Sequence, residues 1–247
     1  MVRQDVLGEV VRYDIARDIA GRGRYWTTAY RVGATLIDTG CAHAANEFMS
    51  VLAGQPIERI LLTHAHEDHI GGVGAVRRSK GAVTVLAHPE TAAVLAEPRR
   101  RQPLHPYRRV MWGWPDPAPA TPVADGDQVD AGDFRFQVLH LPGHSSDHLG
   151  FWEPDRGWLF TGDLYVGGRD RALRVDGDVH GTIASLERVA ELPIQRLFPG
   201  AARIPEGPVA ALREKVAYYR EMEERIRVLH GRGLGVGAIA RAVFGGQ

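Results

Sequence analysis

Three histidines and an aspartate lie within six consecutive positions of this sequence: His64, His66, Asp68 and His69. Imidazole nitrogens and carboxylate oxygens are the ligands that first-row divalent metals prefer, and zinc is the first candidate for such a set. The alternative is a solvated, histidine-rich loop, but no structural role requires so many ligand groups at this spacing. The cluster therefore predicts a metal centre.

The elements around this cluster can aim its side chains at one point. Residues 59–63 have the pattern of a short buried strand that leads into the cluster. His64 and His66 are two positions apart, so their side chains point the same way in an extended chain. Asp68 opens the next segment and is suited to cap the N-terminus of a helix. We therefore expect a strand end and a helix start to hold the four ligands.

The pattern H-x-H-x-D-H after a hydrophobic strand resembles the signature of the metallo-β-lactamase superfamily of metallohydrolases. Two later motifs match the same pattern: a Pro-Gly-His turn that ends in His144 and a Thr-Gly-Asp turn that ends in Asp163. Each follows a strand-like segment. The resemblance extends from about Val10 to Pro205, which is most of the chain.

The resemblance implies two adjacent metal positions. In the superfamily, one position takes both histidines of H-x-H and the Pro-Gly-His imidazole. The second takes the Asp-His pair and a final histidine, and one aspartate bridges the two. The implied metal ligands here are His64, His66, Asp68, His69, His144 and Asp163. Asp68 is also expected to act in catalysis by orienting the nucleophile.

The final histidine of that pattern is absent, because the last Pro-Gly turn continues with Ala201. The second position would keep three protein ligands, which is enough for a catalytic metal with open coordination positions. Three outcomes follow: an unequal dinuclear site, a mononuclear site, or a replacement ligand from elsewhere. His180 is the first candidate for a replacement, and the alternative is that it caps a helix or faces solvent.

Hydrophobic periodicity by itself indicates a mixed α/β chain in one domain. Strand-like segments such as residues 6–15 and 134–139 alternate with helix-like segments such as residues 42–52 and 182–192. The resemblance adds a more specific expectation: an αββα four-layer sandwich of the metallo-β-lactamase type, with the metal site at one edge between two β-rich halves. We expect this domain to span residues 1–205.

Residues 206–247 are expected to form a C-terminal helical extension. Apolar residues recur at helical spacing over residues 208–230, and a Gly-rich turn leads to a short helix over residues 238–244. We expect the extension to pack against the sandwich or against a second subunit, so a homodimer is one option. Arg232 and Arg241 are the only basic residues of the final segment, which disfavours a DNA-reading role.

Residues 97–122 contain several prolines and arginines and fit no regular element. We therefore expect a long loop that serves as a lid or substrate loop. Tyr107, Trp112 and the arginines of this segment could hold an anionic small molecule, since arginine pairs well with carboxylate or phosphate. An equal alternative is a solvated connector whose aromatic side chains plug the edge of the sandwich.

A second group of candidate substrate-binding residues follows Asp163. Tyr165 is a candidate donor to an oxyanion, the alternative being passive lining of the pocket. Arg169, Arg171 and Arg174 form a basic cluster that is expected near the mouth of the metal site. The alternative for this cluster is ion pairing with the neighbouring aspartates.

The composition limits the partners. Among 247 residues, 30 Lys+Arg balance 30 Asp+Glu, which argues against a general polyanion binder and disfavours nucleic acid as a partner. No apolar run is long enough to span a bilayer, and the N-terminal residues carry no apolar signal core. We therefore expect a cytoplasmic protein with no membrane association. The single cysteine, Cys41, precludes an internal disulfide.

These features together predict a metal-dependent hydrolase that uses a zinc-activated hydroxide on an ester, thioester or lactone bond, with one or two Zn²⁺ per chain. The turns are most similar to those of the glyoxalase II and lactonase-like branch. One alternative is an Fe²⁺ enzyme like the persulfide dioxygenases of the superfamily, with His64, His144 and Asp163 as a facial triad. A phosphodiesterase and a degenerate, non-enzymatic binding protein are further alternatives.

Overall fold

Two β-sheets form the centre of the molecule in the computed structural model, which describes residues 1–170, 173 and 177–245. The first sheet has seven strands in the order β1-β2-β3-β4-β5-β6-β7. Strands β1 to β4 pair antiparallel, whereas β4 to β7 run parallel. The strands are β1 (Val2–Leu7), β2 (Val10–Ile19), β3 (Arg22–Val32), β4 (Thr35–Ile37), β5 (Arg59–Leu61), β6 (Thr84–Ala87) and β7 (Thr121–Pro122).

The second sheet has five strands in the order β12-β11-β10-β9-β8. Its strands pair antiparallel except for β11 and β12, which are parallel. The strands are β8 (Gln128–Ala131), β9 (Phe134–His140), β10 (Leu149–Glu153), β11 (Trp158–Gly162) and β12 (Arg196–Pro199). The two sheets therefore come from the two halves of the chain, as the sequence predicts.

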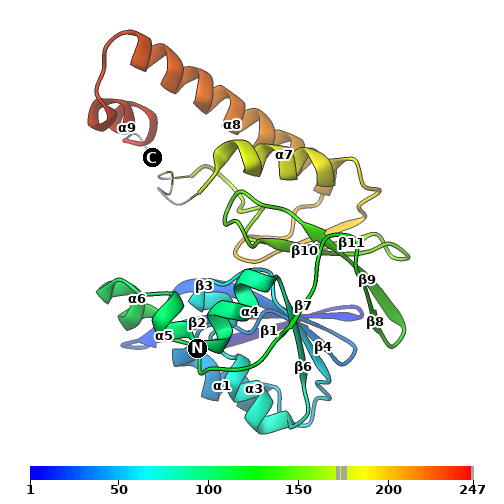
Figure 1. Ribbon diagram of the computed structural model, residues 1–247. Helices are drawn as coiled ribbons and strands as arrows, with labels where there is room; N and C mark the ends of the chain where they lie inside the picture. Colours follow the sequence, from blue (N-terminus) through cyan, green and yellow to red (C-terminus); the bar gives the residue numbers. More distant parts are fainter. Residues whose placement is uncertain (171–172, 174–176, 246–247) are drawn as a thin grey trace.

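Helices cover the outer face of each sheet, so the molecule has four layers (Figure 1). The first sheet carries α1 (Ala45–Val51), α3 (Val73–Lys80) and α4 (Pro89–Ala96), with the short 3₁₀ helix η1 (Ala42–Ala44) before α1. The second sheet carries α7 (Val179–Ala190) and α8 (Pro208–Gly231). The αββα sandwich expected from the sequence is confirmed.

Three hydrophobic clusters hold these layers together. Phe48 and Val76 of the first helix layer pack on the first sheet. The two sheets face each other through a second cluster rich in aromatic side chains, in which the Tyr30 ring lies 5.4 Å from the Phe160 ring. A third cluster joins the second sheet to α7 and α8. Removal of this apolar surface from water is the main driving force for the layered packing.

The strand ends place the metal-binding motifs at one edge of the sandwich. β5 ends at Leu61, directly before the H-x-H motif, and the short helix α2 (Glu67–Ile70) follows it. β11 ends at Gly162 beside the end of its parallel neighbour β12, so Asp163 and Gly200 come together. In open α/β sheets, the carboxyl ends of strands are where ligands usually bind.

Two local expectations are wrong. Residues 6–15 do not form one strand, because Gly8 adopts a left-handed φ of 78° and turns the chain between β1 and β2. Asp68 does not cap a helix, because α2 begins at Glu67 and His66 occupies the cap position. Asp68 instead lies in the first turn of α2, where its negative charge is favourable to the helix dipole.

Residues 97–122 are also more regular than expected. They contain α5 (Pro98–Arg101), α6 (Pro106–Met111) and strand β7. Two of the prolines in this segment, Pro98 and Pro106, occupy the first helical positions of α5 and α6. Proline is well suited to that position, because its missing N–H has no partner there in any helix.

The C-terminal extension packs on the outer side of the sandwich. Leu212, Val216 and Met222 of α8 join Leu186 and Val189 of α7 in one buried cluster. Helix α9 (Val236–Phe244) follows after a turn at Gly233. Among the residues that the structure describes, no helix is both long and apolar enough to cross a bilayer.

Candidate metal centre

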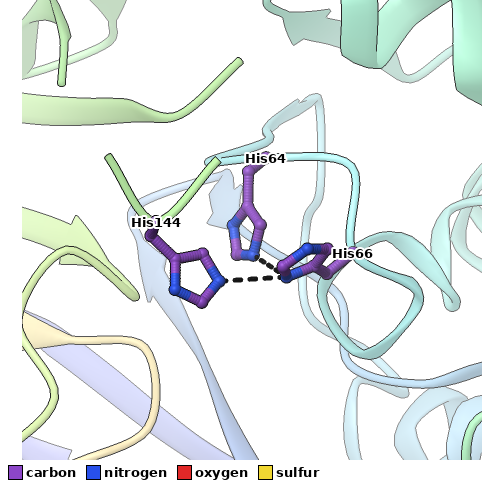
Figure 2. A group of neighbouring side chains, drawn as sticks. All are labelled: His64, His66 and His144. Carbon is purple, nitrogen blue, oxygen red and sulfur yellow. Dashed lines mark hydrogen bonds between the residues drawn. The ribbon is translucent and has the colours of Figure 1, made fainter. Parts of the chain in front are cut away.

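Three imidazoles from two distant segments converge at the edge of the sandwich (Figure 2). Nε2 of His64 lies 2.9 Å from Nδ1 of His66, and Nε2 of His144 lies 3.0 Å from the same atom. The first two rings come from the loop after β5, and the third comes from the Pro-Gly-His turn after β9. The three nitrogens are close enough to bind one metal ion together.

The backbone of the Pro-Gly-His turn requires glycine. Gly143 has a φ of 145°, and a Cβ atom at this position would overlap the backbone of Thr182 at the start of α7. This close approach seats the turn against the helix, and Ser185 strengthens the contact by donating a hydrogen bond to the Pro142 carbonyl. His144 is thereby positioned from the second half of the chain.

A second group of ligand atoms lies next to the first. Nε2 of His69 lies 3.4 Å from Oδ1 of Asp163, and His64 belongs to this group as well. The other Asp163 oxygen lies 3.8 Å from Nε2 of His144. Asp163 therefore stands between the two groups, which is the place of the bridging carboxylate that the resemblance implies.

The donor atoms of this cluster fit a divalent cation. Nε2 of His69 and Oδ1 of Asp163 are buried, and within the described residues neither has a hydrogen-bond partner. Buried polar atoms are usually paired, so two such atoms facing each other fit a site for a divalent cation. The set of nitrogen and oxygen ligands is typical of zinc and is also compatible with iron.

The electrostatics differ between the two groups. Burial lowers the pKa of His64 well below its usual value, and the neighbouring imidazoles lower it further. Burial opposes protonation of His69 as well, but the carboxylates of Asp163 and Asp38 outweigh it and raise the pKa of His69 well above its usual value. Burial would raise the pKa of Asp163, but His69 lowers it. His64 is thus kept as a neutral imidazole, whereas His69 lies among carboxylates whose negative charge a metal cation would balance in place of the ring proton, which is released when the ring binds a metal.

Asp38 supports this centre and was missed in the sequence. Its carboxylate lies 2.7 Å from Nδ1 of His69 and accepts hydrogen bonds from the Thr63 backbone N–H and hydroxyl. Asp38 is 2% exposed and has a left-handed φ of 60°, an uncommon backbone conformation for a residue other than glycine. The one sequence feature that could have identified Asp38 is its position directly after strand β4, because polar residues at the ends of such strands often belong to a binding site.

Asp147 and His148 connect the two halves of the centre. The Asp147 carboxylate accepts hydrogen bonds from the Ala65 backbone N–H and the Thr91 hydroxyl. The His148 ring is buried and stacks on His64 with the ring centroids 5.0 Å apart. Both residues follow the His144 turn, so the loop that carries one ligand also fixes the loop that carries two others.

Residues 27–201 match the profile of the metallo-beta-lactamase superfamily. The chain belongs to this superfamily. It is 32% identical over 166 residues to a hydroxyacylglutathione hydrolase from Bdellovibrio bacteriovorus, covering 67% of this chain and 56% of the relative. The chain therefore spans a little over half of that relative's length.

Solved structures agree on the fold. The metallo-beta-lactamase family protein TTHA1429 from Thermus thermophilus superposes with a TM-score of 0.69 and 22% identity, over 88% of this chain and 82% of that one. TTHA1623, solved in a di-iron-bound form, gives a TM-score of 0.59 and 29% identity, over 78% of this chain and 93% of that one. The first likeness concerns the fold only.

Asp68 and Ala201, which stands where the superfamily pattern has its last histidine, are sequence neighbours of residues in or next to the second ligand group. Oδ2 of Asp68 accepts a hydrogen bond of 3.1 Å from the Thr27 hydroxyl of β3, and Asp68 is not among the atoms that converge in the two groups. Ala201 is exposed, and its neighbour Gly200 packs so closely that a Cβ atom there would lie 2.7 Å from Oδ1 of Asp163. The superfamily's last turn is therefore in place without its imidazole.

His180 does not replace that imidazole. It lies in the first turn of α7, its side chain is 77% exposed, and its Nε2 atom lies 3.4 Å from a carboxylate oxygen of Glu223. This agrees with the solvent-facing alternative.

The candidate substrate-binding residues fall into two pairs, one on and after α6 and one after β11. Tyr107 is 54% exposed on α6, and its ring lies 6.1 Å from that of Trp112. Tyr165 and Arg169 line a cavity between the loop after β11 and α8. Of the basic cluster, only Arg169 can be placed, because Arg171 and Arg174 fall outside the described residues.

A cavity of about 180 Å³ lies directly beside His144 and Asp163. Leu164, Val179 and Tyr219 give it apolar walls, and Tyr219 belongs to the C-terminal helix α8. No lysine or arginine lines it within the part of the chain that the structure describes. The extension is therefore part of the wall next to the metal centre.

Proposed function

We propose that this chain is a metal-dependent hydrolase of ester-type bonds, with thioesters of the hydroxyacylglutathione kind as the first substrates to test. The observation that carries the proposal is the convergence of His64, His66 and His144 beside His69 and Asp163. The likeness to a hydroxyacylglutathione hydrolase supports a thioester, and lactones and simple esters complete the substrate class.

The positions of these residues suggest a role for each of them. His64, His66 and His144 would hold one divalent metal ion, and His69 and Asp163 would hold a second, with zinc as the metal we propose. Such an ion acidifies a coordinated water to a pKa near 7 and polarises a carbonyl oxygen. Asp68, held by Thr27 at the side of the cluster, would orient the attacking water.

The apolar cavity beside His144 and Asp163 would take the acyl part of the substrate. A bound acyl group would displace water from its apolar walls, and this would strengthen the electrostatic contacts inside the site. Leu164 and Val179 in its lining favour an apolar or weakly polar acyl group, and Asp170 and Asp178 in the same lining disfavour an anionic one.

The test combines metal analysis with a substrate panel. Protein purified without added metal is analysed by mass spectrometry for bound metal, then assayed on thioesters, lactones, esters and phosphodiesters. We expect zinc and turnover of a thioester or lactone, both lost in His64→Ala. His230→Ala, which removes an exposed histidine of α8, is the matched control and should keep both. Metal-loaded protein that turns over none of these bonds would refute the hydrolase.

A second candidate is an iron-dependent oxygenase. His64, His69 and Asp163 converge as two imidazoles and one carboxylate, and Nε2 of His144 lies 3.8 Å from Asp163, so the residues of a facial triad are available. The iron in the related TTHA1623 supports this option. Iron in the purified protein together with oxygen consumption on a glutathione persulfide would favour it over the hydrolase.

A further inference from the structure

Glu67 is a fully buried carboxylate in the middle of the metal-binding motif. It lies between His66 and Asp68 and is 0% exposed. A buried charge costs free energy unless it is paired and hydrogen-bonded. The H-x-H-x-D-H pattern does not specify the residue at this position, so the role of Glu67 has to be inferred from its own contacts.

The partner of Glu67 is Arg108 of α6. Nε and an Nη atom of Arg108 donate to the two oxygens of Glu67 at 2.6 and 2.8 Å, which is a bidentate pair. The arginine side chain is 19% exposed, so water screens this pair little. A planar guanidinium that pairs with a carboxylate through two hydrogen bonds fixes the relative orientation of the two groups and also strengthens their interaction.

A second contact reaches the same loop from the same segment. Nε2 of Gln102 donates a hydrogen bond of 2.9 Å to the Ala65 carbonyl. Gln102 is itself held, because Nε1 of Trp114 donates to its backbone carbonyl at 3.0 Å. Ala65 and Glu67 are the sequence neighbours of His66, so Gln102 and Arg108 hold the chain on both sides of this histidine.

We propose that Arg108 and Gln102 are positioning residues that hold His66 in place for the metal, and that residues 97–122 therefore act as a brace of the metal-binding loop. This inference rests on the proposed metal centre. It assigns the segment a role other than the lid or substrate loop expected from the sequence. It also engages one of the arginines that the sequence offered for anion binding.

The spacing of the three imidazoles explains why such a brace matters. Nδ1 of His66 is the atom that lies within 3.0 Å of both His64 and His144. A displacement of His66 would therefore separate all three nitrogens from their shared metal position. Groups that orient ligands typically contribute about 10- to 100-fold to metal affinity. A buried ion pair is in contrast a weak source of stability, since an apolar pair often does equally well.

The experiment measures metal affinity by competition with a chelator and, separately, the unfolding midpoint of the metal-free protein. Arg108→Met should weaken metal binding about 10- to 100-fold. This variant leaves an extra negative charge near the site, which by itself would favour a cation, so weaker binding would point to lost positioning. Arg108→Lys should recover little of the affinity, because an ammonium group cannot form the bidentate pair. Gln102→Ala should weaken binding in the same direction.

Two further variants separate positioning from general stability. Arg78→Met breaks the exposed pair between Arg78 and Asp116, whose atoms lie 2.7 Å apart, and should leave the metal affinity unchanged. The double variant Glu67→Gln/Arg108→Met removes both buried charges and restores the net charge of the wild type. We expect its metal-free midpoint to recover towards the wild type while its metal affinity stays low.

The outcomes distinguish this inference from the proposed function. Wild-type protein that binds no metal would overturn both. Wild-type protein that binds metal, with Arg108→Met binding equally well, would overturn the brace alone. If the double variant recovered both its metal affinity and its metal-free unfolding midpoint, the brace would likewise be overturned, because Arg108 would then contribute only to the stability of the fold.

Discussion

The carboxylate of Asp38 lies 2.7 Å from Nδ1 of His69, beneath the second group of metal-binding atoms. Because Nδ1 is engaged there, Nε2 of the same ring is directed at Asp163. In the neutral ring that binds a metal, a carboxylate at Nδ1 fixes the tautomer in which Nδ1 carries the proton and Nε2 is the ligand atom. Asp38 therefore decides what His69 can do, although 31 positions separate them.

Asp38→Asn should weaken the second metal position. The amide nitrogen placed opposite Nδ1 of His69 would favour the tautomer whose Nε2 carries the proton and faces Asp163. We expect metal affinity at this position to fall about 10- to 100-fold, with the first position nearly unaffected. Stepwise titration with metal, followed by calorimetry, measures the two affinities separately. Equal affinities in variant and wild type would show that Asp38 does not set the tautomer.

Ala201→His should strengthen the second metal position. Ala201 is exposed, and its neighbour Gly200 already touches Asp163 and His69, so a histidine side chain has both room and nearby partners. We expect more metal bound per chain than in the wild type, measured by mass spectrometry after removal of free metal. Ala210→His, at an exposed position of α8, is the control for unspecific binding by an added histidine.

His180→Ala should leave the metal content unchanged. Its exposed ring pairs with Glu223 on α8, so it is directed away from the ligand groups. The matched variant is His69→Ala, which removes one of the converging nitrogens and should lower the metal content. A loss of metal in His180→Ala would show that a rearranged loop brings this imidazole to the centre.

Removal of metal should destabilise the folded protein. A ligand that binds only the native state adds about 2.7 kcal/mol when its free concentration is about 100 times the dissociation constant. Thermal unfolding with added zinc and with excess chelator measures this difference, and the expected shift grows with zinc concentration. A transition that stays at one temperature under both conditions would mean that the native cluster holds no zinc.

Asp147→Ala should destabilise the fold and the loop that carries His64 and His66. The change leaves the Ala65 N–H and the Thr91 hydroxyl without their shared acceptor in a buried place. An unsatisfied buried polar group costs about 1 to 3 kcal/mol. Denaturant unfolding gives the change, and Asp133→Ala, at an exposed position before β9, is the control.

The sequence by itself determined the fold class of this protein and the residue types of its candidate metal centre. Three imidazoles at H-x-H-x-D-H spacing, with the turns before His144 and Asp163, are local patterns, and local patterns survive in a linear sequence. The same holds for the amphipathic helix over residues 208–230, which appears as α8. The helices α5 and α6 were not expected from the sequence because a proline that interrupts a pattern, such as Pro106, can equally begin a helix.

Only the tertiary structure decided which groups support the centre. Glu67 and Arg108 are 41 positions apart, and Asp147 lies 82 positions from Ala65. No periodicity relates such pairs, because they meet only when the two sheets and the segment between them pack together. The same packing turned His180 towards Glu223 and left Ala201 exposed beside the second ligand group. Ligand types are thus readable from sequence, whereas their positions and partners depend on contacts between distant segments.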